Sequence, residues 1–436
     1  MQYSSTLKNV IISLADKVMG TRIMSYYHLI NKMQAWSKED ILNWQIVKLK
    51  ELIEHAYNNT EYYKKLFDKH GIKPENITKI EDLKKIPILT KFDIIKNYNE
   101  LIPKNISTIP HMQSATGGST GDPMQFLLDK ASWSFSNANN IYNWEITGYN
   151  YGDKYIALGS TSLFVNKKRS LAHTIYYRLK NKIGLNGVNM SAKVCANYVA
   201  LIQKKKIRFI YGYASAIYLL AKYVKEKNIK LNIDVCFPTS EVLIDLYKST
   251  IKEAFKCKIL DGYGASDGGI TAFDHKEGCF KVGYNAIIRT INKEADISEL
   301  LLTDTLNYAM PLINYKIGDE VIMNDPKAHP CEYNGQIINK VLGRTSEIIE
   351  LENGNVLTGP GFTILFKDIP VEYYYIEKIG VNSINCTINK LQSYNEKHEK
   401  IIYSTFSNMM GPESTISINY SDQIKYTNSG KRKYFN

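Results

Sequence analysis

The chain has 436 residues, of which 44% are hydrophobic and 22% charged, a composition typical of a globular protein with two or three domains. Its 55 lysine and arginine residues against 43 aspartate and glutamate residues give a formal charge of +12. This excess fits an anionic partner, but no basic arm or nucleic-acid motif accompanies it, and a small phosphorylated ligand would satisfy it. We therefore expect no nucleic-acid partner.

The N-terminal stretch "MQYSSTLKNVIISLADKVMG" has no apolar core of the kind that a signal peptide needs, and no later run approaches the length of a membrane span. The sequence therefore predicts a cytoplasmic protein without a membrane span. Its oligomeric state stays open. Six cysteines are scattered along the chain, which favours free thiols with at most one metal site. They are Cys195, Cys236, Cys257, Cys279, Cys331 and Cys386.

Two helix starts stand out in the first hundred residues. Ser37 and Asp40 form a capping-box pattern, and Thr90 begins a new helix after a proline break. The residues at near-helical spacing after Ser37, which we expect to face the core, are Ile41, Trp44, Val47, Leu52 and Ala56.

The stretch "SATGGSTGDPMQF", residues 114–126, packs three glycines and four hydroxyl residues into its first eight positions. Glycines let backbone N–H groups converge on an anion, and short hydroxyl side chains add donors without bulk. A phosphate-binding loop and a plain surface turn both fit this composition.

Strand-like and helix-like segments alternate in the middle of the chain. The runs "IRFIYGY", "IDVCFPTSE" and "KILDGYGASD" read as buried strands, with helices over residues 214–228 and 241–255 between them. This order predicts a parallel sheet, whose ligands bind beyond the carboxyl ends of the strands. The polar loops expected at that rim carry Tyr211, Gly212, Thr239, Ser240, Glu241, Tyr263, Gly264 and Asp267.

After about residue 280 the pattern changes to alternating strand-like runs, with a tight hairpin turn expected at Asn353-Gly354. We interpret the last ninety or so residues as a small separate α+β domain that is entered near Gly343. The predicted domains are therefore residues 1–342 and 343–436.

The phosphate-loop candidate resembles the loop with which adenylate-forming enzymes hold the β and γ phosphates of ATP. The P-loop and dinucleotide patterns of other nucleotide folds are absent. The resemblance implies nucleotide contacts from Ser114, Thr116, Gly117, Gly118, Ser119, Thr120 and Gly121, and from Ser240, Glu241 and Gly264 on the rim.

Four further motifs follow in the order of that superfamily. "DGYGASDGG" resembles its adenine and magnesium motif, which implies that Tyr263 packs on the base, Ser266 meets the α-phosphate or acyl group, and Asp267 binds Mg²⁺. The superfamily usually has Glu at the last position, so the metal ligand here is shorter by one methylene.

"PLINYKIGDEV" resembles the ribose motif, and a carboxylate such as Asp319 can accept hydrogen bonds from both ribose hydroxyls. "LGRTSEII" resembles the hinge motif, with Arg344 at ribose or phosphate and Glu347 where Asp is usual. "NSGKRKY" supplies Lys431 as the catalytic lysine that the resemblance implies. Taken alone, it would be a solvated basic tail.

Within the superfamily the chain looks most like the phenylacetate-CoA ligases and their CapK-type relatives in bacterial capsule biosynthesis. The segments that carry this likeness are residues 62–94, 211–224 and 239–267. It implies a large N-terminal α/β domain with a parallel sheet core and a small mobile C-terminal α+β domain.

The implied reaction uses ATP and Mg²⁺ to turn a small carboxylic acid into an acyl-adenylate. The acyl group would then pass to a thiol of CoA or of a pantetheine carrier protein, or to an amine such as an amino sugar, in surface polysaccharide biosynthesis. A degenerate nucleotide-binding scaffold or sensor of the same fold is the alternative.

Many relatives in this branch carry a small zinc site between the magnesium motif and the hinge. His275, Cys279, His329 and Cys331 stand in those places and would form a tetrahedral Cys₂His₂ site with a structural Zn²⁺. Two stray cysteines and two surface histidines would give the same pattern.

Four aromatic residues after the phosphate-loop candidate have two interpretations. They would line an apolar acyl pocket or pack in the core, and the second arrangement is the more frequent one for aromatics at helical spacing. They are Trp133, Phe135, Tyr142 and Trp144.

Overall fold

The structure is a computed structural model. It describes residues 5–116, 124–159, 180–187, 190–243, 245–292, 297–323, 331–343, 349–350, 356–357, 365–366, 369–411, 413–423 and 425.

A nine-stranded mixed sheet forms the centre of the fold. From β4 through β3, β5 and β6 to β8 the neighbouring strands are parallel, as the alternating pattern predicts, whereas β9, β10 and β14 continue the sheet in antiparallel fashion. In spatial order the strands are β14 (Ile337–Ile338), β10 (Phe280–Val282), β9 (Ile270–Asp274), β8 (Asp261–Ala265), β6 (Val235–Thr239), β5 (Phe209–Tyr213), β3 (Tyr155–Gly159) and β4 (Lys182–Asn186), and β7 (Lys258–Ile259) also pairs with β6.

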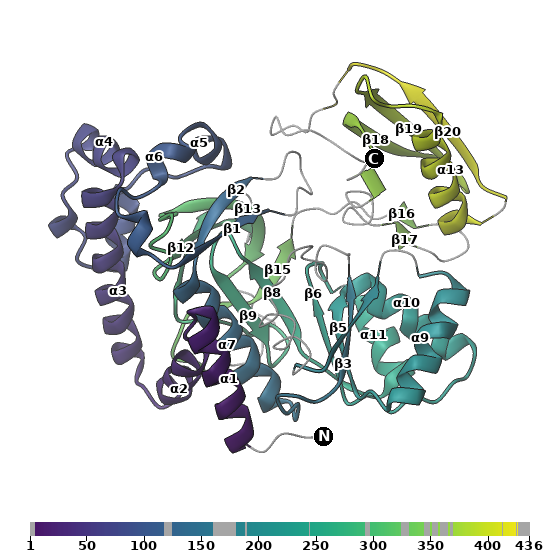
Figure 1. Cartoon of the computed structure of the whole chain (residues 1–436), viewed down its shortest axis with the longest axis horizontal. Coiled ribbons are helices and arrows are strands. Elements are labelled where there is room, and N and C mark those ends of the chain that lie inside the picture. Colours follow the sequence, from purple (N-terminus) through teal and green to yellow (C-terminus); the bar gives the residue numbers. More distant parts are fainter. Residues whose placement is uncertain are drawn as a thin grey trace.

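Three crossover helices pack beside the parallel strands (Figure 1). They are α9 (Ala192–Lys205), α10 (Ala214–Glu226) and α11 (Asp245–Phe255). The last two correspond to the two helices predicted in this region. Their buried side chains, such as Ile217, Leu220 and Ile251, pack with Ile210 and Cys236 from the strands. This burial explains why the strands read as continuous apolar runs.

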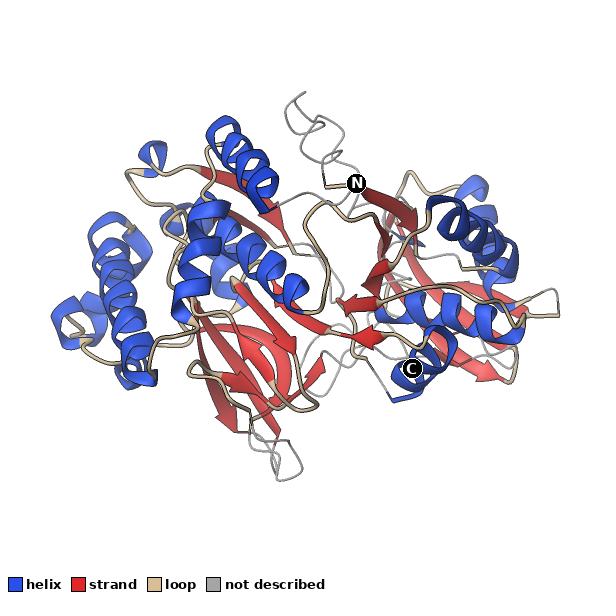
Figure 2. Ribbon diagram, turned by 90° about the horizontal axis from the view of Figure 1, so that it is seen from below, coloured by secondary structure: helices blue, strands red, loops and turns tan. Residues whose placement is uncertain are grey.

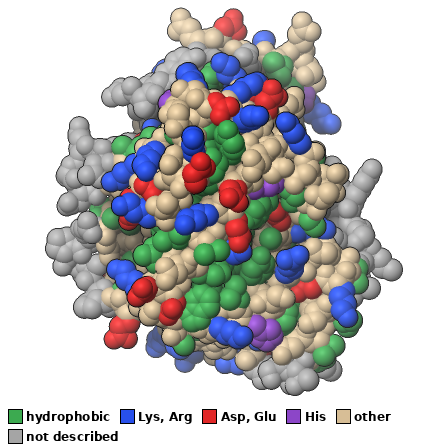
Figure 3. Space-filling view, turned by 90° about the vertical axis from the view of Figure 1, so that its left-hand side faces the viewer, with side chains coloured by type: hydrophobic (Ala, Val, Ile, Leu, Met, Phe, Trp, Pro, Cys, Tyr) green, Lys and Arg blue, Asp and Glu red, His purple; other side chains and the backbone are tan. Residues whose placement is uncertain are grey.

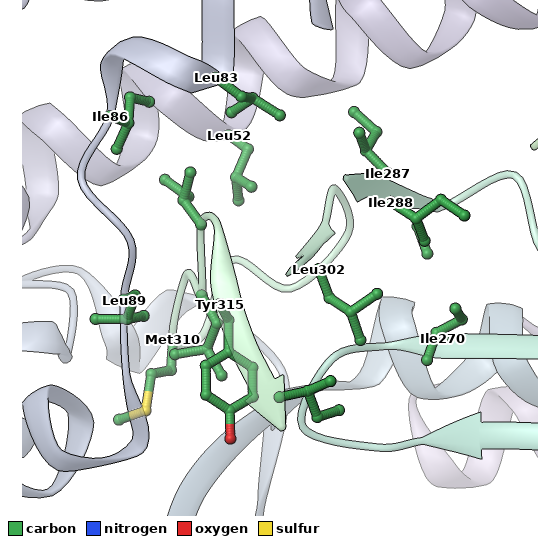
Figure 4. Packing of buried hydrophobic residues seen from close by; sticks show 14 of the residues in the cluster. Leu52, Leu83, Ile86, Leu89, Ile270, Ile287, Ile288, Leu302, Met310 and Tyr315 are labelled. Carbon is green, nitrogen blue, oxygen red and sulfur yellow. The ribbon is translucent and has the colours of Figure 1, made fainter. Parts of the chain in front are cut away.

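A second, antiparallel sheet packs against the N-terminal helices. Its strands are β11 (Ala286–Asn292), β12 (Ile297–Asp304), β13 (Tyr315–Ile322) and β15 (Lys340–Gly343). Leu52, Leu83 and Ile86 from the helical segments approach Leu302 and Tyr315 from the sheet in one buried cluster (Figure 4). Seen from below, the N-terminal helices lie beside a group of strands in the left half of the view (Figure 2).

The N-terminal helical region confirms both predicted helix starts. Ser37 and Asp40 make the capping box of α3, and Thr90 caps α5. Val47 is an exception to the predicted core face, because its side chain is 51% exposed. The helices before the sheet are α1 (Ser5–Met19), α2 (Ile23–Met33), α3 (Lys38–Asn59), α4 (Glu61–His70), α5 (Lys91–Lys96) and α6 (Tyr98–Leu101), with 3₁₀ turns at Pro74–Asn76, Ile80–Lys85 and Ile106–Thr108.

A three-stranded sheet and one helix near the C-terminus bury their own apolar cluster. The elements are β18 (Val371–Gly380), β19 (Ser383–Lys390), α13 (Glu396–Met410) and β20 (Thr415–Tyr420). The short strands β16 (Ile349–Glu350) and β17 (Val356–Leu357) pair antiparallel, as a hairpin requires. Residues 353 and 354 themselves lie outside the described residues. The domain boundary at residue 343 stays a prediction.

The face of the molecule that carries α3 and α4 is not continuously basic (Figure 3). On the side that carries α3 and α4, acidic and basic side chains alternate around a central group of apolar ones (Figure 3). Among the described residues, no helix combines the length and the apolar character needed to cross a membrane.

A pair of facing carboxyl groups makes the central sheet sensitive to pH. Asp261 on β8 stands opposite Asp274 on β9, and burial, followed by the charge of Asp274, raises the pKa of Asp261 to about 7. A carboxyl group whose pKa is higher in the folded than in the unfolded state binds its proton more tightly when folded, so its ionisation opposes folding. We expect the stability of the chain to fall as the pH rises from about 4 to 7.

Asp261→Asn should weaken this pH dependence, because the amide cannot ionise. The measurement is the urea unfolding midpoint of both chains at several pH values from 5 to 8. Glu54→Gln, a change at an exposed carboxylate of α3, serves as the control. Equal pH profiles for the native and Asp261→Asn chains would contradict the prediction.

Candidate active site

Two predicted rim residues follow β6, and the structure gives them distinct conformations. Ser240 adopts a left-handed backbone conformation with φ 68°, which is uncommon for a residue with a side chain and is concentrated at functional sites. Glu241 accepts a hydrogen bond from the backbone N–H of Ser215 (2.8 Å), in the first turn of α10. This carboxylate therefore holds the rim loop to the positive end of a helix.

Two reciprocal hydrogen bonds connect the central sheet with the second sheet. Tyr263 on β8 donates its hydroxyl to Asp319 Oδ2 on β13 (2.7 Å), and Tyr315 on β13 donates to Asp267 Oδ2 just beyond β8 (3.0 Å). Asp267 and Asp319 are only 7% and 9% exposed. The structure thus brings together three of the residues predicted at the nucleotide. Ser266, the neighbour of Asp267, is exposed at the same edge.

The sequence analysis did not identify Tyr315 as a site residue. Its backbone is fixed to a distant segment, because Leu89 N–H donates to Asn314 O (3.2 Å) and Lys316 N–H donates to Leu89 O (2.8 Å). Its ring is buried beside Leu89 and Met310, and its hydroxyl points out of the apolar cluster (Figure 4). The only sequence signal was its place on the same strand, four residues before Asp319, within the ribose motif.

Asp304 at the end of β12 is a second polar centre that the sequence analysis did not single out. It is buried and accepts hydrogen bonds from the Ser132 hydroxyl, from Asn285 Nδ2 (3.1 Å) and from the Leu306 N–H (3.1 Å). Burial raises the pKa of Asp304 to about 6. A β-carbon on Gly269 would lie 2.0 Å from Asp304 Oδ2, so the loop that follows Asp267 can approach it only with glycine there.

The base of the phosphate-loop candidate is a closed hairpin. Ser114 lies on β1 (His111–Ala115), which pairs antiparallel with β2 (Gln125–Asp129). Beyond the strands, Thr116 N–H donates to Met124 O and Met124 N–H donates to Thr116 Oγ1, both at 2.9 Å. The Thr116 hydroxyl is therefore engaged in closing the loop.

Several predicted site residues lie outside the described residues, so their roles stay predictions. They are Gly117, Gly118, Ser119, Thr120, Gly121, His329, Arg344 and Lys431.

The predicted zinc site is not supported. Cys279 and Cys331 form a disulfide, and His275 Nε2 donates to Asn143 Oδ1 (2.6 Å). Disulfide sulfurs are not thiolate ligands for zinc, so these donors do not fit the metal. Within the described part of the chain no group of three or more His, Cys, Asp or Glu side chains could hold a metal ion. The expectation of free thiols is wrong for this pair, and it is confirmed for Cys195, Cys236, Cys257 and Cys386.

The aromatic residues after the phosphate-loop candidate lie on α7 (Lys130–Ile146), where they pack with other apolar groups. Phe135 is fully buried against the N-terminal helices, and Trp144 stacks on Phe237 with ring centroids 4.1 Å apart. The core interpretation is therefore right for these two side chains.

Comparison with known proteins supports the resemblance along most of the chain. No protein-family model matches it. It is 23% identical to the protein CapK of Staphylococcus aureus over 98% of this chain and 96% of CapK. It is 22% identical to a phenylacetate-coenzyme A ligase of Pseudomonas putida over 76% of this chain and 78% of that protein. The chain is therefore similar to CapK over nearly its whole length and to the phenylacetate-CoA ligases over about three quarters of it.

The fold is confirmed by a solved structure. A 2-hydroxyisobutyryl-CoA ligase in complex with its acyl-AMP and CoA aligns with a TM-score of 0.59 at 14% identity, covering 92% of this chain and 91% of that one. The chain therefore has the fold of the adenylate-forming enzymes. The predicted enzyme class, an adenylate-forming ligase, agrees with the phenylacetate-coenzyme A ligases among the similar proteins.

Tyr315→Phe should destabilise the chain, because it removes a hydroxyl donor from a buried carboxylate. A hydrogen bond to a charged group contributes about 1.5–3 kcal/mol to stability. The measurement is the free energy of unfolding in urea, with Tyr403→Phe on the exposed side of α13 as the matched control. Equal losses for the two variants would show that the Tyr315–Asp267 hydrogen bond contributes nothing.

The cysteine pairing is directly testable by mass spectrometry. When the chain is purified and unfolded without reductant and then alkylated, four cysteines should be modified and one peptide should link Cys279 to Cys331. All six should react after reduction. Six reactive thiols before reduction, together with one bound zinc per chain, would restore the metal site instead.

Proposed function

We propose that this chain is an adenylate-forming ligase that uses ATP to activate a small carboxylic acid. The observation that carries the proposal is the reciprocal pair of tyrosine–aspartate hydrogen bonds, Tyr263 to Asp319 and Tyr315 to Asp267. These bonds hold two buried carboxylates at the carboxyl end of the parallel strands, where sheets of this type bind ligands.

In the proposed first step, the substrate carboxylate attacks the α-phosphorus of ATP and gives acyl-adenylate and pyrophosphate. Asp319 would accept the ribose hydroxyls, and Ser266 would meet the α-phosphate or acyl group. In the structure one oxygen of Asp319 already accepts the Tyr263 hydroxyl. Ribose binding therefore requires Tyr263 to share that carboxylate or to turn toward the base. Lys431 would neutralise charge that develops during the attack.

Asp267 fits the magnesium role in its chemistry. Mg²⁺ in nucleotide sites is commonly held by one or two carboxylates together with phosphate oxygens. Tyr315 binds Oδ2 of Asp267 and so fixes the orientation of the carboxylate from one side. The ion would neutralise phosphate charge when bound. The zinc ligands do not fit, and zinc has no part in the proposal.

The second step would transfer the acyl group to a thiol of CoA or of a carrier protein. The phenylacetate-coenzyme A ligases to which the chain is similar support the thiol acceptor. An amine acceptor in surface polysaccharide assembly, within the cytoplasm, is the alternative that the sequence resemblance implies. A rotation of residues 343–436 between the two steps belongs to the same proposal.

The test is carboxylate-dependent exchange of labelled pyrophosphate into ATP, with a panel of aryl, short-chain and amino acids. We expect exchange with one class of acid, and a fall of about a hundredfold or more in Lys431→Ala, because the lysine stabilises charge only in the transition state. Asp319→Asn should raise the KM for ATP about tenfold, since an amide accepts fewer hydrogen bonds from the ribose.

Both this enzyme and the degenerate scaffold of the same fold would bind ATP, so pyrophosphate exchange is the result that separates them. A native chain that binds ATP but exchanges nothing across the panel would favour the scaffold. Exchange that persists unchanged in Lys431→Ala would contradict the role of the lysine while keeping the enzyme.

A further inference from the structure

A cavity of about 120 Å³, open to solvent, is lined by residues near the strand ends opposite to the candidate active site. β9 runs antiparallel to β8, so Asp274 at its end stands beside Asp261 at the start of β8. His275, the residue after Asp274, lines the cavity. Asp267, in contrast, lies beyond the other end of β8. The five residues of β8, a length of roughly 13 Å, separate these two strand ends.

The cavity is lined by residues of α7, β10 and the segment around Tyr333. Asn139 on α7 donates to Thr271 Oγ1 on β9 (2.8 Å) and so bridges helix and strand between the cavity and the rim. The cavity and the candidate active site therefore lie toward opposite ends of the strands of the same sheet.

One wall of the cavity is polar and neutral. Asn143 donates its amide to Asn139 O (2.7 Å), so its Oδ1 is the acceptor for His275 Nε2–H. Burial, and then the charge of Lys281, lowers the pKa of His275 to about 4. At neutral pH the histidine is uncharged, and its hydrogen bond to Asn143 fixes the tautomer.

Lys281 on β10 is the cation of this cavity. Within the described residues its ammonium has no carboxylate at ion-pair distance, and Nζ lies 5.5 Å from the centre of the Tyr333 ring. Burial and then the charge of Lys276 lower its pKa, and the charge of Glu332 offsets this only in part. A half-buried ammonium beside another lysine has an excess of positive potential that an anion would neutralise.

The opposite wall is aromatic and held in place. The rings of Tyr284 and Tyr333 stack with centroids 5.2 Å apart, and the Tyr333 hydroxyl donates to Val282 O (2.5 Å). The Cys279–Cys331 disulfide joins the two segments that carry Lys281 and Tyr333, each two residues further along the chain. This link fixes the cation relative to the rings before any ligand arrives.

We infer that this cavity binds a small aromatic carboxylate, whose anionic group meets Lys281 and whose ring packs against Tyr284 and Tyr333. A cation, an aromatic surface and fixed amide groups in one concave site are the features that bind small aromatic anions. A hydroxyl on the far side of the ring would reach the Asn143–His275 wall. The inference is independent of the proposed function, because it uses none of the residues at the nucleotide rim.

The test is isothermal titration of the full chain with 4-hydroxybenzoate in the presence of saturating ATP. We expect binding to the native chain that weakens about tenfold or more in Lys281→Gln, since the variant removes the charge that meets the carboxylate. Lys281→Arg, which keeps the charge, should restore most of the affinity. Lys252→Gln on the exposed side of α11 is the control and should bind as the native chain does.

Equal affinity in the native and Lys281→Gln chains would place the ligand elsewhere, including the candidate acyl pocket, and would overturn the inference. So would the absence of any binding to the native chain at about 10 mM ligand, a concentration at which even a weak millimolar site is filled. The urea unfolding midpoint of each variant shows whether the fold is intact. These results are independent of pyrophosphate exchange, so the inference and the proposed function can fail separately.

Discussion

The candidate active site depends on the crossing of two tyrosine–aspartate hydrogen bonds between separate sheets. Each sheet contributes one tyrosine donor and one aspartate acceptor. Tyr263 on β8 donates to Asp319 on β13, and Tyr315 on β13 donates to Asp267 just beyond β8. Buried carboxylates are costly unless hydrogen-bonded. The two phenols satisfy that need and also fix the distance between the carboxylates. The same two hydrogen bonds therefore fix both the relative position of the sheets and the geometry of the site.

The N-terminal helices maintain this crossing from outside. Leu89 lies in the extended segment before α5, and its backbone forms a bridge with Tyr315 through hydrogen bonds to both neighbours of that residue. Asn314 donates its side-chain amide to Leu83 O (2.6 Å) and to Ile86 O (2.9 Å). A helical region that contributes no residue to the rim thus sets the start of β13, because these buried backbone acceptors would otherwise lack donors.

We propose a ligand site near each end of the strands of the central sheet, and the physical reasons differ. At the carboxyl ends of the parallel strands, loops and a helix N-terminus gather, and Glu241 shows the attraction of that end for anions. The opposite edge is formed where β9 and β10 reverse direction, and there single side chains, above all Lys281 and the stacked tyrosines, supply the chemistry. The topology of the fold accounts for the site at the carboxyl ends of the parallel strands. The side chains of this particular sequence account for the site at the opposite end.

The sequence by itself determined many of the elements and the likeness to the CoA ligases. The capping box at Ser37, the alternating strands and helices and the ordered motifs are local patterns, and each is set by residues close together in the chain. Only the tertiary structure decided which side chains meet. Tyr315 and Asp267 are 48 positions apart, and Cys279 and Cys331 are 52 apart. No local pattern distinguishes a buried phenol that holds a carboxylate from one that only fills the core. Nor does it distinguish a thiol that binds zinc from one that pairs with another thiol. The difference is the distance between atoms from separate segments, which exists only once the sheets have packed.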